Sequence, residues 1–454
     1  MKKIWVLLIG IKLIFSCISL QSQNTVTKPW NYNIYVELKD SVLYVNLTIK
    51  ATKENLQTNF LLFNRYIKIK KATLNNVPFN YTRHNDTLYF KSFQREEITL
   101  SMQYDIPCST SGYSRIITSY GDSTYTYPIL FDTSQIFFER FYKWYPVIYD
   151  NFSNYDVTVS VPKTHKVFAY YPETNCRSID EKVVYSYNCF DEDFPFLITQ
   201  ADIFQEKRVI VHNKTYFEFD FLPRKKRLLA VTDKKPVYIS DKLQIDSLLN
   251  VIMNRCVNAL DWYNNNLWQQ QTDTLRFIET RIFGLGVCMN SFILMDRSLI
   301  NMEALDNYAF SHEIGHLWIG SHTEYLAKGK YFLGESVNEY VNLLYFESWA
   351  GENAFENAIQ DKINLKYSDV PFFTVSFEQV LNQRNGNLQT EVIYNKGVVF
   401  VHEFRKMIGK EKLLKIIRET YSVPNHFVTL KDFEKSIKEN GCWNEYLKLY
   451  TMKL

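Results

Sequence analysis

The sequence has no repeat period, no low-complexity tract and no long run of like charge across its 454 residues. These absences argue against a solenoid and against a nucleic-acid-binding tail. A long apolar run occurs at the amino terminus and nowhere else, so the rest of the chain is expected to lie outside the membrane. With 46% hydrophobic and 22% charged residues, the chain can bury large cores, which argues against disorder and predicts two domains.

The amino terminus has the composition of an export signal. Two lysines precede an apolar stretch that ends at Ile11, and Lys12 makes the stretch too short for a membrane span. Cys17 follows a small residue, as at a bacterial lipoprotein processing site, so residues 1–17 are predicted to be a signal peptide and Cys17 the attachment point of a lipid. The alternative is ordinary cleavage near Ser19. We therefore expect an exported protein, either a periplasmic or cell-envelope lipoprotein or a soluble secreted form.

Apolar and polar residues alternate through much of the first half of the chain. The alternation runs through residues 34–38, continues after a short turn through residues 43–49, and returns in residues 155–161. A period of two is typical of strands with one buried face. The sequence therefore predicts a β-rich amino-terminal domain over residues 24–208.

The pattern becomes helical in the second half. Leu248, Leu249, Ile252, Met253, Cys256 and Leu260 lie on one face of a predicted helix. Residues 275–278 are apolar and predict a strand, and helical patterns follow up to the carboxyl terminus. A second, mainly helical domain is predicted over residues 209–454, which gives an α+β chain of two domains.

The sequence His-Glu-Ile-Gly-His at residues 312–316 indicates a metal site. Residues four apart lie on one face of an α-helix, so His312 and His316 can point at the same ion. Glu335 follows after eighteen residues and can supply the third protein ligand, which leaves a fourth position open for water, as in catalytic zinc sites. Glu313 is then the candidate general base. We predict one bound zinc ion.

Three blocks, His312 to Trp318, Gly334 to Tyr340 and Tyr394 to Gly397, resemble the gluzincin family of aminopeptidase N and leukotriene hydrolase. The resemblance implies a β-sandwich or saddle-shaped domain followed by a thermolysin-like zinc-peptidase domain. It also implies zinc binding by His312, His316 and Glu335, general-base catalysis by Glu313, and stabilisation of the oxyanion by Tyr394. We therefore expect an exported zinc metallopeptidase that acts on peptide substrates.

One departure from the family concerns the amino group of the substrate. Aminopeptidases of this type carry Gly-x-Met-Glu-Asn upstream of the zinc helix, and the Glu of this motif binds the free amino terminus. This chain has Gly-Val-Cys-Met-Asn at residues 286–290, so Met289 stands where that acid is expected. Glu279 is the carboxylate that could substitute for it. We therefore expect recognition of the amino terminus to be relaxed or replaced.

Several roles stay open at this level. Glu339 lies one helical turn beyond Glu335 and either supports a histidine ligand or is a solvated carboxylate. His322 is assigned to a loop. Cys176 and Cys189 are the first pair to test for a disulfide, and separate thiols are the alternative. Cys288 is expected to have a packing role.

Two other functions remain as alternatives to the peptidase. The first is a peptide-binding surface protein with weak catalysis, which the missing amine anchor would suit. The second is a hydrolase of a non-peptide substrate. The sequence gives no oligomeric state and no side-chain preference.

Overall fold

The computed structural model describes residues 29–451 except 53–59, 92–95, 109–129, 133, 139–142, 148–151, 192, 205, 223–226, 233–234, 271–272, 282–285, 290–291, 297–299, 301–308, 321–322, 324–328, 365–388 and 424–425. The predicted export signal with Cys17 and the loop residue His322 lie outside the described residues.

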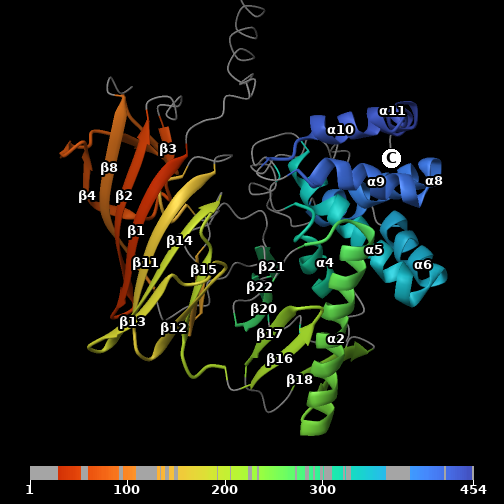
Figure 1. Cartoon of the computed structure of the whole chain (residues 1–454), viewed down its shortest axis with the longest axis horizontal. Coiled ribbons are helices and arrows are strands. Elements are labelled where there is room, and N and C mark those ends of the chain that lie inside the picture. Colours follow the sequence, from red (N-terminus) through yellow and green to blue (C-terminus); the bar gives the residue numbers. More distant parts are fainter. Residues whose placement is uncertain are drawn as a thin grey trace, which may run out of the picture.

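The amino-terminal part is built of sheets, as the sequence predicts (Figure 1). Its largest sheet has the strand order β13 (Asn175–Ile179), β14 (Lys182–Asp191), β11 (Ser153–Pro162), β1 (Trp30–Lys39), β2 (Val42–Thr52), β8 (Glu97–Pro107), β4 (Lys68–Leu74) and β5 (Val77–Pro78). Two smaller sheets contain β12 (His165–Ala169), β15 (Phe196–Gln200), β10 (Gln135–Phe138) and β9 (Leu130–Asp132), and then β3 (Phe60–Leu62), β7 (Thr87–Tyr89) and β6 (Thr82–His84).

The two alternating stretches at residues 34–38 and 43–49 form the antiparallel hairpin of β1 and β2. Ile34 pairs with Leu47 and Val36 with Val45, and all four side chains are buried. The turn residues Asp40 and Ser41 both have positive φ, 51° and 58°, as a two-residue hairpin turn with the right-handed twist of the strands requires. The alternating apolar residues of these strands therefore line one core.

The cysteine pair named for a disulfide test does not form one. Cys176 on β13 pairs across the sheet with Tyr185, whereas Cys189 on β14 pairs with Tyr155. Cys176 is exposed, Cys189 is buried, and both are free thiols. The two residues flank the same hairpin, but the strand register separates them. The alternative of separate thiols is the correct one.

The second part combines a five-stranded sheet with helices. The sheet has the order β16 (Glu206–His212), β17 (Thr215–Phe221), β20 (Thr274–Thr280), β22 (Phe292–Asp296) and β21 (Gly286–Met289), and a separate hairpin joins β18 (Arg227–Thr232) to β19 (Lys235–Ile239). The described helices are α2 (Lys242–Asn266), α4 (Ala309–Gly315), α5 (Val337–Ala350), α6 (Glu352–Asn364), α8 (Gly397–Ile408), α9 (Lys410–Tyr421), α10 (Leu430–Glu439) and α11 (Trp443–Thr451), with π-helical turns η4 (Phe332–Ser336) and η6 (Gln389–Lys396).

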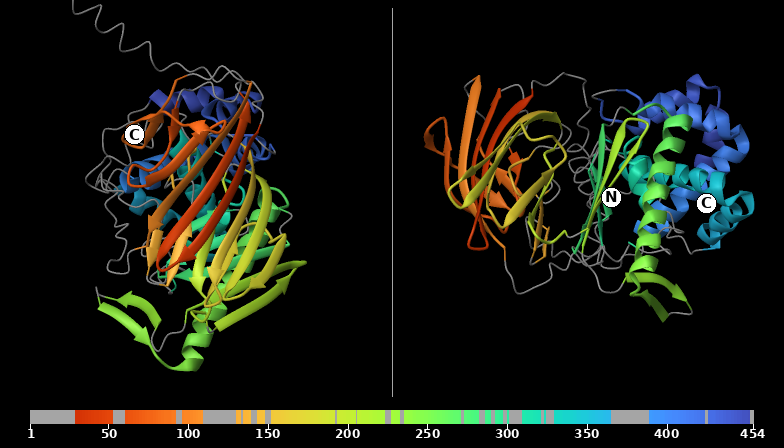
Figure 2. Two further views of the ribbon diagram at one scale, coloured as in Figure 1. Left: turned by 90° about the vertical axis from the view of Figure 1, so that its left-hand side faces the viewer. Right: turned by 60° about the horizontal axis from the view of Figure 1, so that its bottom comes forward.

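The five-stranded sheet lies between the amino-terminal sheets and the helices (Figure 2). Phe217 and Phe277 on one face belong to the core shared with the helices, whereas Ile278 on the other face packs against Leu197 of β15. The buried amide of Gln135 on β10 also contacts the end of β20. Its Oε1 accepts the N–H of Arg281 at 2.7 Å, and its Nε2 donates to the carbonyl of Glu279 at 3.4 Å. The two parts therefore share an apolar and hydrogen-bonded contact.

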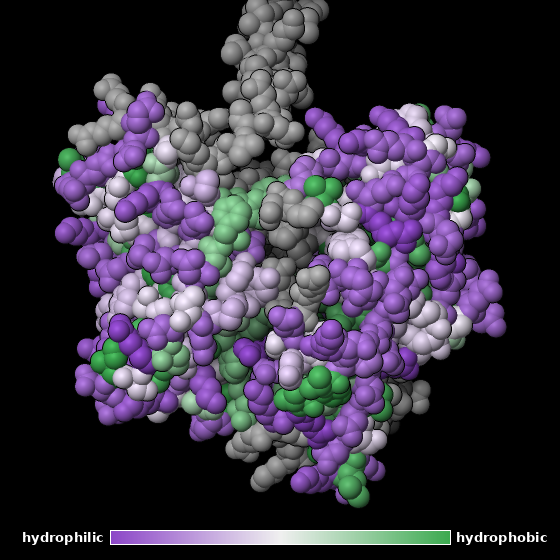
Figure 3. Space-filling model, viewed as in Figure 1, coloured by the Kyte–Doolittle hydropathy of each residue, from purple (hydrophilic) through white to green (hydrophobic). Residues whose placement is uncertain are grey.

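The expected fold class is confirmed, because a sheet-rich amino-terminal region precedes a helical region. The division after residue 208 stays a prediction, and β16 begins at Glu206. None of the helices among the described residues has the length and apolar character that a membrane crossing needs. The face drawn in Figure 3 is mainly hydrophilic, with a hydrophobic patch where Figure 1 shows β16 and β17, whose exposed residues include Val209 and Val211.

Candidate metal centre and active site

Helix α4 carries His312, the first metal-ligand candidate, and His316 follows directly after its end. Phe310 and Ile314 are buried in the core of the second domain and fix this helix, while His312 and Glu313 extend from its other side. The helix ends at Gly315, one residue earlier than the motif, and His316 follows in a tighter turn with its N–H donating to the carbonyl of Glu313 at 3.2 Å. The two imidazole rings nevertheless lie side by side, with centroids 4.9 Å apart.

The glycine inside the motif allows α4 to pack closely against its neighbours. A Cβ atom on Gly315 would lie 2.2 Å from Oδ1 of Asn338 on α5 and 2.6 Å from the hydroxyl of Tyr263 on α2. Both residues hold α4 in place: Asn338 donates to the carbonyl of His312 at 2.9 Å, and Tyr263 donates to the carbonyl of Ser311 at 3.2 Å. A larger residue would push the histidines away from α5.

The three predicted ligands converge. His312, His316 and Glu335 each offer an atom, and these atoms lie within 4.8 Å of one another. Nε2 of His312 is 3.4 Å and Nε2 of His316 is 3.7 Å from Oε2 of Glu335. Ligand atoms about 2.0–2.1 Å from a tetrahedral zinc ion lie roughly 3.3 Å apart. The triad therefore has a spacing close to that of a zinc site.

The outer nitrogen of each histidine also has a partner. Nδ1 of His312 lies 2.9 Å from Oε2 of Glu339, and Nδ1 of His316 lies 3.0 Å from the carbonyl of Ile319. Such contacts orient the rings and leave both Nε2 atoms for a metal ion. Of the two interpretations of Glu339, the structure therefore favours support of a histidine ligand.

Glu335 lies in the π-helical turn η4, which leads into the α-helix α5. Such turns are often found at functional sites because they redirect a side chain from the helical path. Burial alone would raise the pKa of Glu335, but His316, His312 and the hydrogen bond from Tyr394 lower it. These groups therefore hold the Glu335 carboxylate in its charged form.

Glu313, the candidate general base, lies on α4 next to His312. Its carboxylate accepts a hydrogen bond from the backbone N–H of Cys288 on β21. Burial raises the pKa of Glu313, the two histidines and the Cys288 N–H oppose the rise, and the net pKa is above the ordinary value. A raised pKa makes a carboxylate a stronger base, better able to take a proton and to return it.

The phenol of Tyr394 points at the same centre. Its hydroxyl donates to Oε2 of Glu335 at 2.8 Å, and its ring centroid is 5.9 Å from that of His312. Tyr394 lies on η6, and η6 packs against η4 through a hydrogen bond of 2.6 Å from Oγ of Ser336 to the carbonyl of Ile393. The Tyr-x-Lys-Gly block therefore lies beside the metal ligands.

Cys288 and Glu279 are both withdrawn from solvent, each in a different part of the second domain. Cys288 is half-buried against the core, and burial raises the pKa of its thiol well above the usual value, as befits a packing residue. Glu279 is almost fully buried on the central strand β20, and its Oε2 accepts the N–H of Leu222 at 2.9 Å. Strand β22 separates β20 from β21. Glu279 is thus engaged elsewhere in the fold.

Asn338 and Lys362 also support the site, although the sequence pattern did not indicate a role for either residue. Asn338 is fully buried and binds the backbone of α4, and Lys362 contacts Glu339 at 2.9 Å. The position of Lys362 offered a signal, because it continues the apolar stripe of Phe355 and Ile359 on α6.

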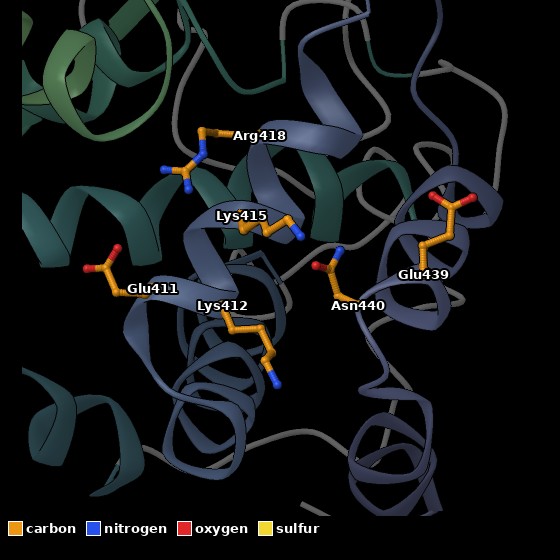
Figure 4. Close-up of a pocket in the computed structure, with 6 residues that line it drawn as sticks. All are labelled: Glu411, Lys412, Lys415, Arg418, Glu439 and Asn440. Atoms are coloured by element: carbon orange, nitrogen blue, oxygen red, sulfur yellow. The ribbon is translucent and has the colours of Figure 1, made fainter.

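A separate hollow of about 460 Å³ lies between α9 and α10 (Figure 4). It is lined by Glu411, Lys412, Lys415, Arg418, Glu439 and Asn440. None of these residues belongs to the metal triad or contacts it. The mixture of three basic and two acidic side chains does not define the charge of a ligand, and we assign no function to this hollow.

Comparison with known proteins identifies the fold. No protein-family model and no curated protein sequence matches the chain. Among solved structures, it is similar to an M1 zinc metallopeptidase from Deinococcus radiodurans, with a TM-score of 0.63 and 11% identity over 94% of both chains. A variant of that enzyme bound to a Tyr-Ser-Ala substrate matches with a TM-score of 0.62 and 11% identity, over 94% of this chain and 95% of that one.

Legionella pneumophila aminopeptidase A, in complex with aspartic acid, matches with a TM-score of 0.68 and 13% identity. That match covers 94% of this chain and 50% of the Legionella protein. At these identities the likeness concerns the fold, and the chain therefore has the two-domain M1 peptidase fold with a His-His-Glu group that could bind a metal ion.

Proposed function

We propose that the chain is a zinc-dependent metallopeptidase. The observation that carries this proposal is the convergence of two histidines and Glu335, at the spacing of a tetrahedral metal site, beside Glu313 and the Tyr394 hydroxyl. The M1 peptidase fold supports the same function. His312, His316 and Glu335 would hold one zinc ion.

The chemistry follows from the neighbours of the triad. A zinc ion held by these residues would supply a coordinated water with a pKa of about 7 and a positive charge for the carbonyl oxygen. Glu313 takes the proton of the attacking water and returns it to the leaving amine, a role that suits its raised pKa. Tyr394 turns its hydroxyl from Glu335 to the oxygen of the substrate carbonyl, where negative charge develops.

Strand β21 is suited to align an extended peptide. It is the last strand of the sheet as described, and its Cys288 N–H reaches Glu313. An exposed strand edge can bind a substrate backbone through main-chain hydrogen bonds. Met289 on this strand cannot pair with an ammonium group, and Glu279 is engaged with Leu222. We therefore propose that binding relies on the peptide backbone, with little contribution from a free amino terminus.

The test is hydrolysis of a mixed peptide library by the zinc-loaded mature protein, with cleavage positions read by mass spectrometry. Glu313→Gln keeps the shape of the side chain and removes its basicity, and we expect it to lower kcat by roughly 10²-fold or more. Lack of cleavage by the wild type, with zinc bound, would overturn the peptidase proposal. It would favour the peptide-binding protein or the non-peptide hydrolase.

A matched pair of substrates tests the amine anchor. We expect a peptide with a free amino terminus and its acetylated form to be cleaved with kcat/KM values within about tenfold of each other. If the enzyme paired a carboxylate with the free amine, acetylation would remove that ion pair and lower kcat/KM by a larger factor. A strong preference for the free amine would contradict this expectation. Glu279→Gln then serves as the control that identifies whether Glu279 is responsible.

We also propose that the protein is exported and that Cys17 carries a lipid, on the strength of the amino-terminal sequence. Substitution Cys17→Ser should release the protein from the membrane fraction without changing its catalytic constants. Unchanged fractionation of this variant would favour ordinary signal cleavage.

A further inference from the structure

Helix α6 places a lysine on its buried face. Phe355 and Ile359 are buried, and Lys362 follows at the next helical position of the same stripe, with its side chain only 14% exposed. Lysine is rarely buried, because removing an ammonium group from water is costly unless the charge is paired. The environment of Lys362 therefore must supply partners.

Those partners belong to two different parts of the active site. Nζ of Lys362 lies 2.9 Å from Oε1 of Glu339 on α5 and 3.0 Å from the carbonyl oxygen of Tyr394 on η6. The other oxygen of Glu339 contacts Nδ1 of His312 at 2.9 Å. Lys362 therefore bridges Glu339, which contacts the predicted metal ligand His312, and the backbone of Tyr394.

A second route joins the same two residues. The Tyr394 hydroxyl donates to Glu335 at 2.8 Å, and Glu335 lies 3.4 Å from Nε2 of His312. His312 and Tyr394 are thus linked on one side by Glu335 and on the other by Glu339 and Lys362. In this closed ring, Lys362 contacts the main chain of Tyr394, so it acts on the position of the whole residue.

We propose that Lys362 is a positioning residue that couples the metal ligand His312 to Tyr394. This proposal rests on the proposed function, in which His312 binds the metal ion and Tyr394 stabilises the oxyanion. Lys362 holds the Glu339 carboxylate in the orientation that contacts His312. It also holds the backbone of Tyr394, and with it the start of the tyrosine side chain, at a fixed distance from the metal ligands. Loss of either contact would rotate an imidazole or displace a phenol, and displacements of about 1 Å can lower a rate 10²-fold.

The variant Lys362→Met tests the proposal, because methionine is a long, neutral and apolar side chain. Lys410→Met is a matched control: Lys410 also pairs with a carboxylate of α5, Glu347, at 2.8 Å, and its partner is not a neighbour of the histidines. Lys362→Arg keeps the charge and the donors. Circular dichroism and thermal unfolding establish that each variant is folded.

The first readout is the zinc dissociation constant, measured by competition with a chromophoric chelator. Loss of an outer contact to a metal ligand typically weakens binding 10- to 100-fold, and we expect this for Lys362→Met, recovery to within about tenfold for Lys362→Arg, and no change for Lys410→Met. Removal of a positive charge by itself would tighten zinc binding, since the site becomes more negative. Tighter or unchanged binding by Lys362→Met therefore overturns the positioning role.

The second readout tests the coupling to Tyr394. In a double-mutant cycle of Lys362→Met and Tyr394→Phe, we expect the combined loss of zinc affinity to be smaller than the product of the single losses by about threefold or more, because the residues share one ring of contacts. Independent effects would overturn the coupling. This cycle needs no turnover, so it is decided even if the protein proves not to be a peptidase.

Where the enzyme is active, kinetics give a further distinction. Lys362→Met should lower kcat by roughly 10-fold or more and change KM little, since Lys362 contacts groups that act in the transition state. A rise in KM with unchanged kcat would contradict a role through Tyr394.

Discussion

Gly397, the last residue of the Tyr-x-Lys-Gly block, lies where two π-helical turns meet. A Cβ atom at this position would be 2.1 Å from Oγ and 2.7 Å from Cβ of Ser336, whereas ordinary contacts begin at 3.4 Å. A new rotamer of Ser336 cannot relieve a clash with its own Cβ, so the backbone must move by about 1 Å. Ser336 directly follows Glu335, and the movement would therefore displace a predicted metal ligand.

The substitution Gly397→Ala should reduce both stability and zinc affinity. Overpacking in a buried site costs about 1–3 kcal/mol, and the gain from alanine in a helix, about 0.5–1 kcal/mol, offsets only part of it. Because metal distances tolerate roughly 0.2 Å, we expect zinc to bind about 10- to 100-fold more weakly. Urea unfolding of the metal-free protein and chelator competition measure the two effects separately.

Two companion variants make the test specific. Gly334 precedes Glu335, but a Cβ there would meet its first neighbour, Oγ1 of Thr323, at 3.9 Å, so Gly334→Ala should leave zinc affinity within about threefold of the wild type. The double variant Ser336→Gly, Gly397→Ala removes the clashing atoms and should recover zinc binding, at a cost of about 1 kcal/mol for the lost Ser336–Ile393 hydrogen bond. Equal damage from Gly334→Ala and Gly397→Ala would refute the close-contact explanation.

Three further outcomes follow from the fold and the site. Burial would raise the pKa of Glu347, but Lys410 and Arg405 lower it below the unfolded value of about 4.3. The contribution of Glu347 to stability is therefore complete above that pH and is lost as the pH falls through the folded pKa. Glu347→Gln should lower the free energy of urea unfolding by about 1–3 kcal/mol at pH 7 and by much less at pH 3, and an equal loss at both pH values would contradict the pairing. A thiol reagent should label the exposed Cys176 quickly in the native state and the buried Cys256 only on unfolding. A reducing agent should leave the melting temperature of the protein unchanged, and a lower melting temperature would indicate a disulfide. Removing zinc present at 100 times its dissociation constant should lower the free energy of unfolding by about 2.7 kcal/mol, and an unchanged melting temperature with a chelator would count against a metal site in the native state.

The site residues that could be predicted from the sequence are those whose spacing along the chain indicates a metal site. His312, His316 and Glu335 were found because a helix and a fixed interval place them around one point, and the structure brings them together. The hairpin of β1 and β2 was found because alternation with a period of two is a local property. Both predictions depend on short stretches of chain.

The parts that the sequence did not predict depend on packing between distant stretches. Lys362 reaches the site only because α6 packs beside α5 and η6, and no interval in the sequence expresses that contact. The π-helical turns at Glu335 and Tyr394 have an extra residue per turn, which a search for the α-helical period does not detect. The register that separates Cys176 from Cys189 is likewise set by the pairing of whole strands.

The charges of the site explain why so many elements converge on it. Three carboxylates, Glu313 on α4, Glu335 on η4 and Glu339 on α5, lie around His312, and the ammonium group of Lys362 on α6 pairs with Glu339. With neutral imidazoles these four side chains sum to a charge of −2, which is costly to bury without compensation. A divalent cation held by the proposed triad would balance this charge. Since each member comes from a different element, the free energy of metal binding would then also act to hold these elements together.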